Sequence, residues 1–408
     1  MNHGMEYQKE ITETEFIKSR FRQITPGHRR FPVVVRYLIV FLLACNNLWA
    51  APRPIPEPPP SEAHAFVLQD FNSGQIIAEK NGDQRVEPAS LTKLMTAYIV
   101  FDELRLGNIK LQDEVLISEK AWRMEGSRMF VEVNKRVSVD DLLKGMIVQS
   151  GNDATVALAE YVAGGEDAFV SMMNQQAARL GMTGTLFANS SGLPDANHYT
   201  TAHDLATLTL ALIRDFPEYY KMYSIEKFTY NGITQHNRNR LLWRDKYVDG
   251  VKTGHTESAG FCLVASALRD NMRLISVVLG TSSEDARETE SLKLLNYGFR
   301  FFETHRLYEG KQQLANARIY KGDKEELSLG LKNDLFVTVP QGRYDDIQAS
   351  MDINSRIIAP VEKDQVLGLV NVTLDGEHIA QRPLVSLEGI AEGGWWQRLS
   401  DEALLMFE

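Results

Sequence analysis

Three short motifs contain the residues of this chain best suited to nucleophilic chemistry. They are Ser90-Leu91-Thr92-Lys93, Ser150-Gly151-Asn152 and Lys252-Thr253-Gly254. A serine becomes a strong nucleophile when a nearby base takes its proton, and a lysine can be that base only if its pKa is lowered. If a helix begins just before Ser90, the Ser90 and Lys93 side chains share one helical face, with the helix dipole beside the hydroxyl. Taken alone, the pair fits an exposed serine and lysine on an ordinary helix better.

The sequence around the motifs predicts the elements that position them. An apolar run over residues 94–100 continues the first motif as a helix, and a capping box at Ser138 opens a helix over 142–148. The second motif ends that helix, and another begins over 154–162. The third motif lies between strand-like runs. Further helices are predicted over 166–180, 202–213 and 284–302, and strands over 65–68, 75–78, 228–230, 260–267 and 273–279. This order predicts an α+β fold, with helices packed against an antiparallel sheet.

The three motifs in this order are typical of serine β-lactamases and penicillin-binding proteins. The chain resembles the low-molecular-mass penicillin-binding proteins of the D-alanyl-D-alanine carboxypeptidase type, peptidase family S11. The resemblance is carried by PASLTKLMTAYIV, QSGNDATVALAE, NRNRLLW, VDGVKTGHT and LLNYGFRFFE, and it covers residues 62–306. It implies a catalytic domain with the fold of serine β-lactamases and penicillin-binding proteins.

The resemblance also implies catalytic roles. Ser90 would attack the carbonyl of the penultimate D-Ala of a peptidoglycan pentapeptide stem and release the terminal D-Ala. Lys93 would be its base, kept neutral by burial and by the nearby Lys252. Ser150 would relay a proton to the leaving amine, and Asn152 would orient Lys93 and the substrate amide. β-Lactams would acylate Ser90 and leave slowly.

Further residues are expected to bind the substrate. Lys252 and Thr253, in the motif completed by Gly254, would hold the terminal carboxylate, and His255 and Thr256 would shape that edge of the site. The backbone N–H groups of Ser90 and His255 would form the oxyanion hole. Relatives carry an arginine near the carboxylate pocket at the position of Arg287; a solvated helix residue is the alternative. The role of His203, where some relatives have arginine, stays open. No cofactor is expected, and the nine histidines show no paired spacing for a metal site.

Three other functions are compatible with parts of this pattern. A class A β-lactamase needs a glutamate after the second motif; Glu166 falls there, but in a helical segment, and the middle motif is Ser-Gly-Asn rather than Ser-Asp-Asn. Cleavage of peptidoglycan cross-links by a D,D-endopeptidase is a variant within the family. A non-catalytic wall-binding protein is the third possibility, and the three intact motifs argue against it.

Composition divides the chain into five segments. Residues 1–50 form an N-terminal extension with a signal peptide, 51–61 a proline-rich linker, and 62–306 the catalytic domain. Short alternating segments predict a small all-β domain over 307–390. Residues 391–408 predict an amphipathic membrane-anchor helix, with an apolar face formed by Trp395, Trp396, Leu399, Ala403, Met406 and Phe407. Packing of this helix on the β domain is the alternative.

The N-terminal segment predicts export. Its uncharged run, residues 37–45, is too short to span a membrane, and basic residues precede it while small residues follow near Ala50. A start near Val35, or lipidation at Cys45, are alternatives. Removing residues 1–50, with seven basic and four acidic side chains, changes the net charge from −10 to −13, which argues against a nucleic-acid partner. Cys262 is then unpaired and is expected to be buried. We expect a peripheral protein on the periplasmic face of the bacterial inner membrane.

Overall fold

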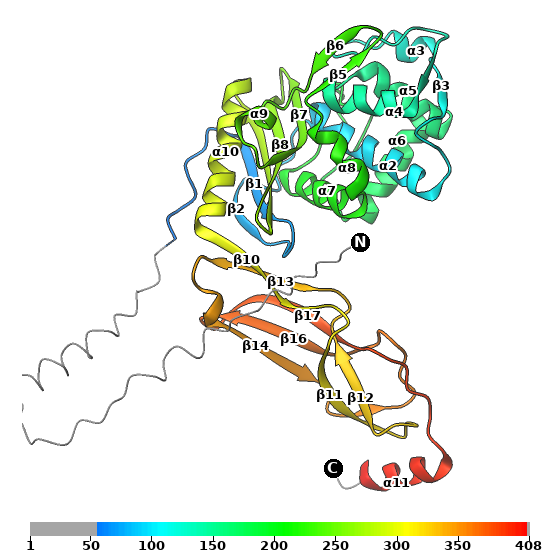
Figure 1. The fold of residues 1–408 in the computed structure, drawn as a ribbon, viewed down its shortest axis with the longest axis vertical. Coiled ribbons are helices and arrows are strands. Elements are labelled where there is room, and N and C mark those ends of the chain that lie inside the picture. The colour runs from blue at the N-terminus through cyan, green and yellow to red at the C-terminus, as the bar shows by residue number, and fades with distance from the viewer. Residues whose placement is uncertain (1–54, 406–408) are drawn as a thin grey trace, which may run out of the picture. The chain divides into compact units, whose positions relative to one another are not determined.

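The computed structural model describes residues 55–405 (Figure 1). The predicted signal peptide, the first residues of the predicted linker and the last three residues of the predicted C-terminal helix lie outside this range.

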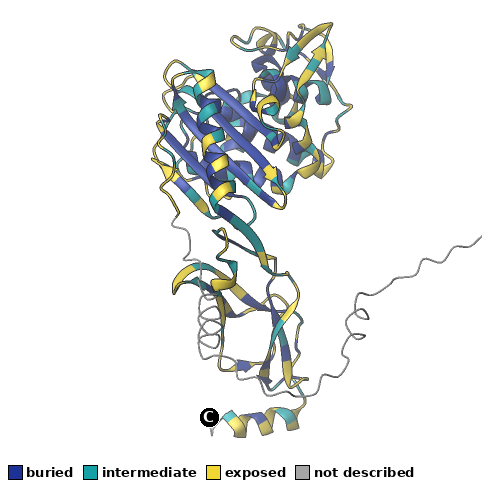
Figure 2. Cartoon of the chain, turned by 60° about the vertical axis from the view of Figure 1, so that its left-hand side comes forward, coloured by how far each residue is buried: buried dark blue, intermediate teal, exposed yellow. Residues whose placement is uncertain are grey.

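A five-stranded antiparallel sheet is the centre of the larger part of the chain. Its order is β2 (Ile76–Lys80), β1 (Ala65–Asp70), β9 (Met272–Thr281), β8 (Gly260–Arg269) and β7 (Val248–Thr256). Successive side chains of a strand point to opposite faces. In β1, Ala65 and Val67 accordingly belong to the core beneath the helical block, whereas Phe66 and Leu68 belong to the core beneath α10 (Glu284–Phe301). The strands β1, β8 and β9 are therefore largely buried on both faces, whereas the edge strand β2 is mostly exposed (Figure 2).

Helices and two small hairpins make up the block between β2 and β7. The helical elements are η2 (Ala89–Thr92), α2 (Lys93–Leu106), α3 (Glu119–Trp122), α4 (Val139–Lys144), η3 (Gly145–Gln149), α5 (Asn152–Ala163), α6 (Glu166–Arg179), α7 (Ala202–Asp215), α8 (Pro217–Tyr220), η4 (Lys221–Ser224) and α9 (Leu241–Arg244). The hairpins pair β3 (Glu114–Leu116) with β4 (Arg136–Ser138), and β5 (Lys227–Tyr230) with β6 (Ile233–His236). The predicted α+β class is confirmed.

One local prediction needs correction. The helix predicted over 142–148 is instead α4 followed by a turn of π-helix, η3, although its capping box is present: the Ser138 hydroxyl accepts from the backbone N–H of Asp141. The strand predicted over 228–230 is confirmed as β5, which pairs with β6 in a hairpin separate from the main sheet. Apolar alternation identifies a strand but not its partner.

The chain continues into an all-β part with its own apolar core. β10 (Phe302–Tyr308) pairs with β13 (Leu335–Pro340). A six-stranded sheet follows the order β14 (Ile347–Ile353), β16 (Val366–Leu374), β17 (Glu377–Ser386), β12 (Glu326–Gly330), β11 (Gln313–Tyr320) and β15 (Ile357–Ile358). A short 3₁₀ turn, η5, covers Tyr344–Asp346.

The C-terminal helix α11 (Trp395–Leu405) contacts this all-β part through polar groups. Asp401 is buried and accepts a hydrogen bond from the backbone N–H of Lys321, whose side chain pairs with Glu402. Trp395 and Trp396 stack on each other and are 64% and 67% exposed. The helix thus presents its apolar residues to solvent. Within residues 55–405, no helix combines the length and the apolar character needed to cross a bilayer.

Candidate active site

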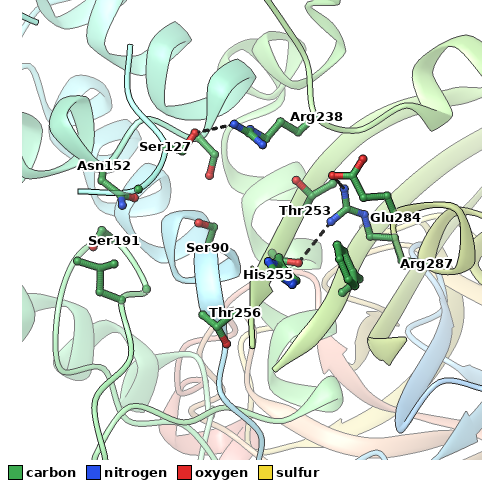
Figure 3. A pocket seen from close by; sticks show the side chains of 16 residues that line it. Ser90, Ser127, Asn152, Ser191, Arg238, Thr253, His255, Thr256, Glu284 and Arg287 are labelled. Carbon is green, nitrogen blue, oxygen red and sulfur yellow. Dashed lines mark hydrogen bonds and ion pairs between the residues drawn. The ribbon is translucent and has the colours of Figure 1, made fainter. Parts of the chain in front are cut away.

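The three motifs meet at one pocket of about 320 Å³ (Figure 3). Eight of the ten predicted site residues line it: Ser90, Ser150, Asn152, Thr253, Gly254, His255, Thr256 and Arg287. The other two, Lys93 and Lys252, are buried and hydrogen-bonded to the two serines. Segments more than 150 residues apart in the sequence therefore supply one site.

Ser90 lies in a 3₁₀ turn, η2, and Lys93 begins the α-helix α2. Side chains three residues apart eclipse each other in a 3₁₀ turn, which brings the Lys93 Nζ to 3.0 Å from the Ser90 Oγ. The same ammonium nitrogen donates to the Asn152 Oδ1 at 2.8 Å and to the Ser191 carbonyl at 2.5 Å. Lys93 is thus fixed by one group from each of three segments.

Gly192 allows the segment that supplies the Ser191 carbonyl to approach η2. Its φ is +88°, and a Cβ at this position would lie 1.8 Å from the carbonyl oxygen of Ala89, the residue before Ser90. Any side chain larger than hydrogen would collide with the backbone that carries the serine. The third acceptor of Lys93 therefore depends on a glycine.

Burial prepares Lys93 to act as a base. Loss of solvation lowers its pKa from 10.5 to about 7; the Asp153 carboxylate opposes this change, and the Arg238 guanidinium adds to it. The Asp153 carboxylate accepts backbone N–H groups of Met129, Phe130 and Val131, which holds it in place. A substantial fraction of Lys93 is then neutral at neutral pH.

Ser150 and Lys252 form the second half of the site. Ser150 ends η3 with a φ of +67°, and the Lys252 Nζ donates to its Oγ at 2.9 Å and to the Thr253 carbonyl at 3.0 Å. Burial, followed by the charge of Lys93, lowers the pKa of Lys252 well below its ordinary value. The positive charge of Arg238 lowers the pKa of Lys93, and the charge of Lys93 in turn lowers the pKa of Lys252. Because the two lysines repel each other, their protonation is linked.

Arg287 lies in the pocket wall. It is buried, its Nη1 approaches the Gly254 carbonyl at 3.5 Å, and its Nη2 lies 3.6 Å from Glu284 (Figure 3). Its guanidinium lies over the Phe261 ring. The His255 ring stacks on the same Phe261 ring, with 4.0 Å between the two centroids. The alternative of a solvated helix residue is therefore wrong. The Arg287 cation faces the same space as Thr253, and together they can receive a carboxylate.

Two sequence models match the chain. The model of the family "D-alanyl-D-alanine carboxypeptidase", peptidase S11, matches residues 53–283, and that of "Penicillin-binding protein 5, C-terminal domain" matches residues 302–392. D-alanyl-D-alanine carboxypeptidase DacA of Escherichia coli (strain K12) is 45% identical over 361 residues, which cover 86% of this chain and 90% of the relative. The chain belongs to the peptidase S11 D-alanyl-D-alanine carboxypeptidase family.

Solved structures agree with this assignment to the S11 family. Penicillin-binding protein 5 from Haemophilus influenzae aligns with a TM-score of 0.80 at 45% identity, covering 83% of this chain and all of that chain. Penicillin-binding protein D2 from Listeria monocytogenes, in its ampicillin-bound form, aligns with a TM-score of 0.56 at 30% identity, covering 60% of this chain and all of that one. The recognition of the family from three motifs is confirmed.

Several pocket residues of this S11 chain escaped the motif analysis. Arg238 donates to the Gln149 carbonyl and to the Ser127 hydroxyl, both at 3.1 Å, and lines the pocket with Ser127. Arg238 lies in the NRNRLLW segment, which contributed to the family resemblance but to which the sequence analysis assigned no function. Ser191 contributes its backbone carbonyl, a group that every residue type carries, so the sequence could not indicate this contact.

Other residues singled out in the sequence lie elsewhere. Glu166 pairs with Lys120 at 2.7 Å and accepts from Ser190, and it does not line the pocket. His203 contacts Asp83 and Glu79, away from the pocket. Cys262 is buried, as expected. No cluster of three or more His, Cys, Asp or Glu side chains suited to a metal ion occurs among residues 55–405.

Proposed function

We propose that this chain is a serine D-alanyl-D-alanine carboxypeptidase that removes the terminal D-Ala from peptidoglycan pentapeptide stems. The observation that carries the proposal is the 3.0 Å contact between the Ser90 Oγ and the Lys93 Nζ, on a lysine whose pKa is lowered to about 7. A neutral amine at that distance can accept the hydroxyl proton. The family assignment supports the reaction.

Acylation follows from the contacts of each group. The neutral Lys93 amine takes the Ser90 proton while the Oγ attacks the carbonyl carbon of the penultimate D-Ala. The backbone N–H groups of Ser90 and His255 receive the oxyanion, and one such donor contributes about 3–4 kcal/mol. Ser150, held by Lys252, passes its proton to the leaving nitrogen as the C–N bond breaks, and the proton that Lys93 took from Ser90 restores the Ser150 hydroxyl, so that Lys93 is neutral again before deacylation. The terminal D-Ala departs, and the carbonyl of the penultimate D-Ala is left as an ester on Ser90.

Binding and deacylation use the same groups. Lys252, Thr253 and Arg287 hold the terminal carboxylate until D-Ala departs, while His255 and Thr256 shape the edge of the pocket. Water then attacks the ester, Lys93 accepts its proton, and Ser90 recovers its own as the C–O bond breaks. A β-lactam presents a strained amide to the same serine, and its ring remains attached after opening, so the acyl-enzyme persists.

The β-lactamase alternative would need Glu166 in the pocket as the base for deacylation, and Glu166 does not line the pocket. Glu166 is engaged by Lys120 and Ser190 outside the pocket and cannot activate a deacylating water there. Cleavage of cross-links has no observation in its favour among the described contacts.

The test of the activity is release of D-Ala from a soluble pentapeptide ending in D-Ala-D-Ala. Ser90→Ala should abolish it, whereas Ser258→Ala, which removes an exposed hydroxyl beside the pocket residue Thr256, should leave it unchanged. Release that persists in Ser90→Ala would reject the mechanism.

We further propose that the protein is exported and lies on the periplasmic face of the inner membrane through α11. The solvent-facing Trp395, Trp396 and Leu399 support this, because adjacent aromatic rings favour the bilayer interface. Residues 392–408 carry one arginine and four acidic side chains, and this net negative charge predicts stronger binding to zwitterionic than to anionic vesicles. Replacing Trp395, Trp396 and Leu399 by serine should abolish co-sedimentation with zwitterionic vesicles, and Trp122→Ser should not. Unchanged co-sedimentation of the triple variant would reject this surface.

A further inference from the structure

A second hollow is lined by residues of α9 and of the first turns of α10; both helices are labelled in Figure 1. It has a volume of about 610 Å³ and is lined by Arg240, Trp243, Arg244, Asp285, Glu288 and Thr289. We call it the α9–α10 groove.

The two hollows share one helix. On α10, Glu284 and Arg287 line the catalytic pocket, whereas the residues that follow each of them, Asp285 and Glu288, line the groove. Arg240, a groove residue, pairs with Glu284 at 3.1 Å. A molecule in the groove therefore lies next to the substrate-binding wall of the pocket.

The groove contains a buried acceptor that has no partner. Glu288 is 1% exposed, and its Oε2 accepts from the Arg244 Nη1 at 2.9 Å. Its Oε1 is buried and, within residues 55–405, has no hydrogen-bond donor. An unpaired buried oxygen costs free energy that a ligand donor would recover. Asp285 lies three residues before Glu288 on the same helical face and adds further acceptors, and the Thr289 hydroxyl also lines the groove.

The other lining groups specify a neutral ligand with an apolar face. Two arginines oppose two carboxylates, so the groove carries no net charge for a polyanion or a polycation. Trp243 is 46% exposed and offers a flat aromatic surface with a polar edge. An N-acetylated sugar matches these features, because its C–H face covers an indole while its hydroxyl and acetamido groups donate to carboxylates and accept from guanidinium groups.

We propose that the α9–α10 groove binds an N-acetylated sugar of the glycan strand that carries the stem peptides. The inference rests on the proposed function, because the glycan lies near Ser90 only if the stem peptide attached to it is the substrate. The groove would hold polymeric substrate beside the pocket and raise its effective concentration there.

The test compares a glycan-linked pentapeptide with the same pentapeptide free of glycan. Trp243→Ala should lower kcat/KM for the glycan-linked substrate by about 5- to 30-fold, the usual effect of truncating a central aromatic contact, and leave the free pentapeptide unchanged. Trp122→Ala, which removes an indole of similar exposure (42%), should change neither. Equal losses on both substrates, or no loss on either, would overturn the proposal. Absence of D-Ala release from the free pentapeptide by the unmodified protein would instead reject the proposed function.

A direct binding measurement supplements the kinetics. An N-acetylglucosamine tetrasaccharide should shift the Trp243 indole N–H resonance, assigned from its absence in Trp243→Ala, and should leave the Trp122 resonance unmoved. D-Alanine, offered as a zwitterionic competitor, should not displace the sugar. No shift with the tetrasaccharide at millimolar concentration, or a shift with D-alanine alone, would contradict the proposal.

Discussion

The pH dependence of acylation should reveal the altered pKa of Lys93. With a pKa of about 7, the neutral fraction of Lys93 is about 3% at pH 5.5 and about 97% at pH 8.5, so the acylation rate should rise about 30-fold and then level off. A lysine with its ordinary pKa would instead give a rise of about tenfold per pH unit, or about 1,000-fold over the same interval.

The cause of the shift can be tested at Arg238, whose charge lowers the pKa of Lys93. Arg238→Gln should move the midpoint of the profile to higher pH, and Arg238→Lys, which keeps the charge, should move it less. The assay is stopped-flow acylation by a fluorescent penicillin across pH 5–10. A rate that still climbs tenfold per unit between pH 8 and 9 in the unmodified protein would refute the assignment of Lys93 as a largely neutral base.

Three further predictions follow from the site. Below pH 7 Lys93 is protonated in both the folded and the unfolded chain, and the buried charge destabilises the fold. Between pH 7 and about 10.5 only the unfolded chain binds the proton, so the free energy of unfolding rises with pH. Lys93→Met should remove this dependence, and its unfolding free energy relative to the unmodified protein should fall by about 2–3 kcal/mol from pH 6 to pH 9 in urea titrations; a constant difference would contradict the burial argument. Gly192→Ala should lower stability by about 2–4 kcal/mol and slow acylation, because its Cβ meets the Ala89 carbonyl; normal acylation would show that the loop can shift freely. Glu166→Gln should leave the deacylation rate of the penicilloyl-enzyme unchanged, since Glu166 lies outside the pocket; a large decrease would support the β-lactamase alternative.

The sequence predicted the motif residues well because their chemistry requires specific side chains. Three segments of the chain supply Ser90 and Lys93, Asn152, and Lys252, and each residue type is needed for a contact that the structure contains. Their order along the chain, rather than any one motif, carried the prediction.

What the sequence could not predict depends on backbone geometry. Ser191 acts through its carbonyl, and Gly192 matters because of how closely it approaches Ala89, a residue about one hundred positions earlier. The π-helical turn η3 follows from tertiary packing and not from propensity. Arg238 was visible as a basic residue in a segment shared with the family, but its position over Ser127 required the fold.

The account depends most directly on Ser90 as the nucleophile. Mass spectrometry of the protein incubated with penicillin should find one penicilloyl adduct, on the proteolytic peptide that contains Ser90, and the Ser90→Ala variant should carry none. An adduct on any other peptide, or an adduct that remains in Ser90→Ala, would contradict it.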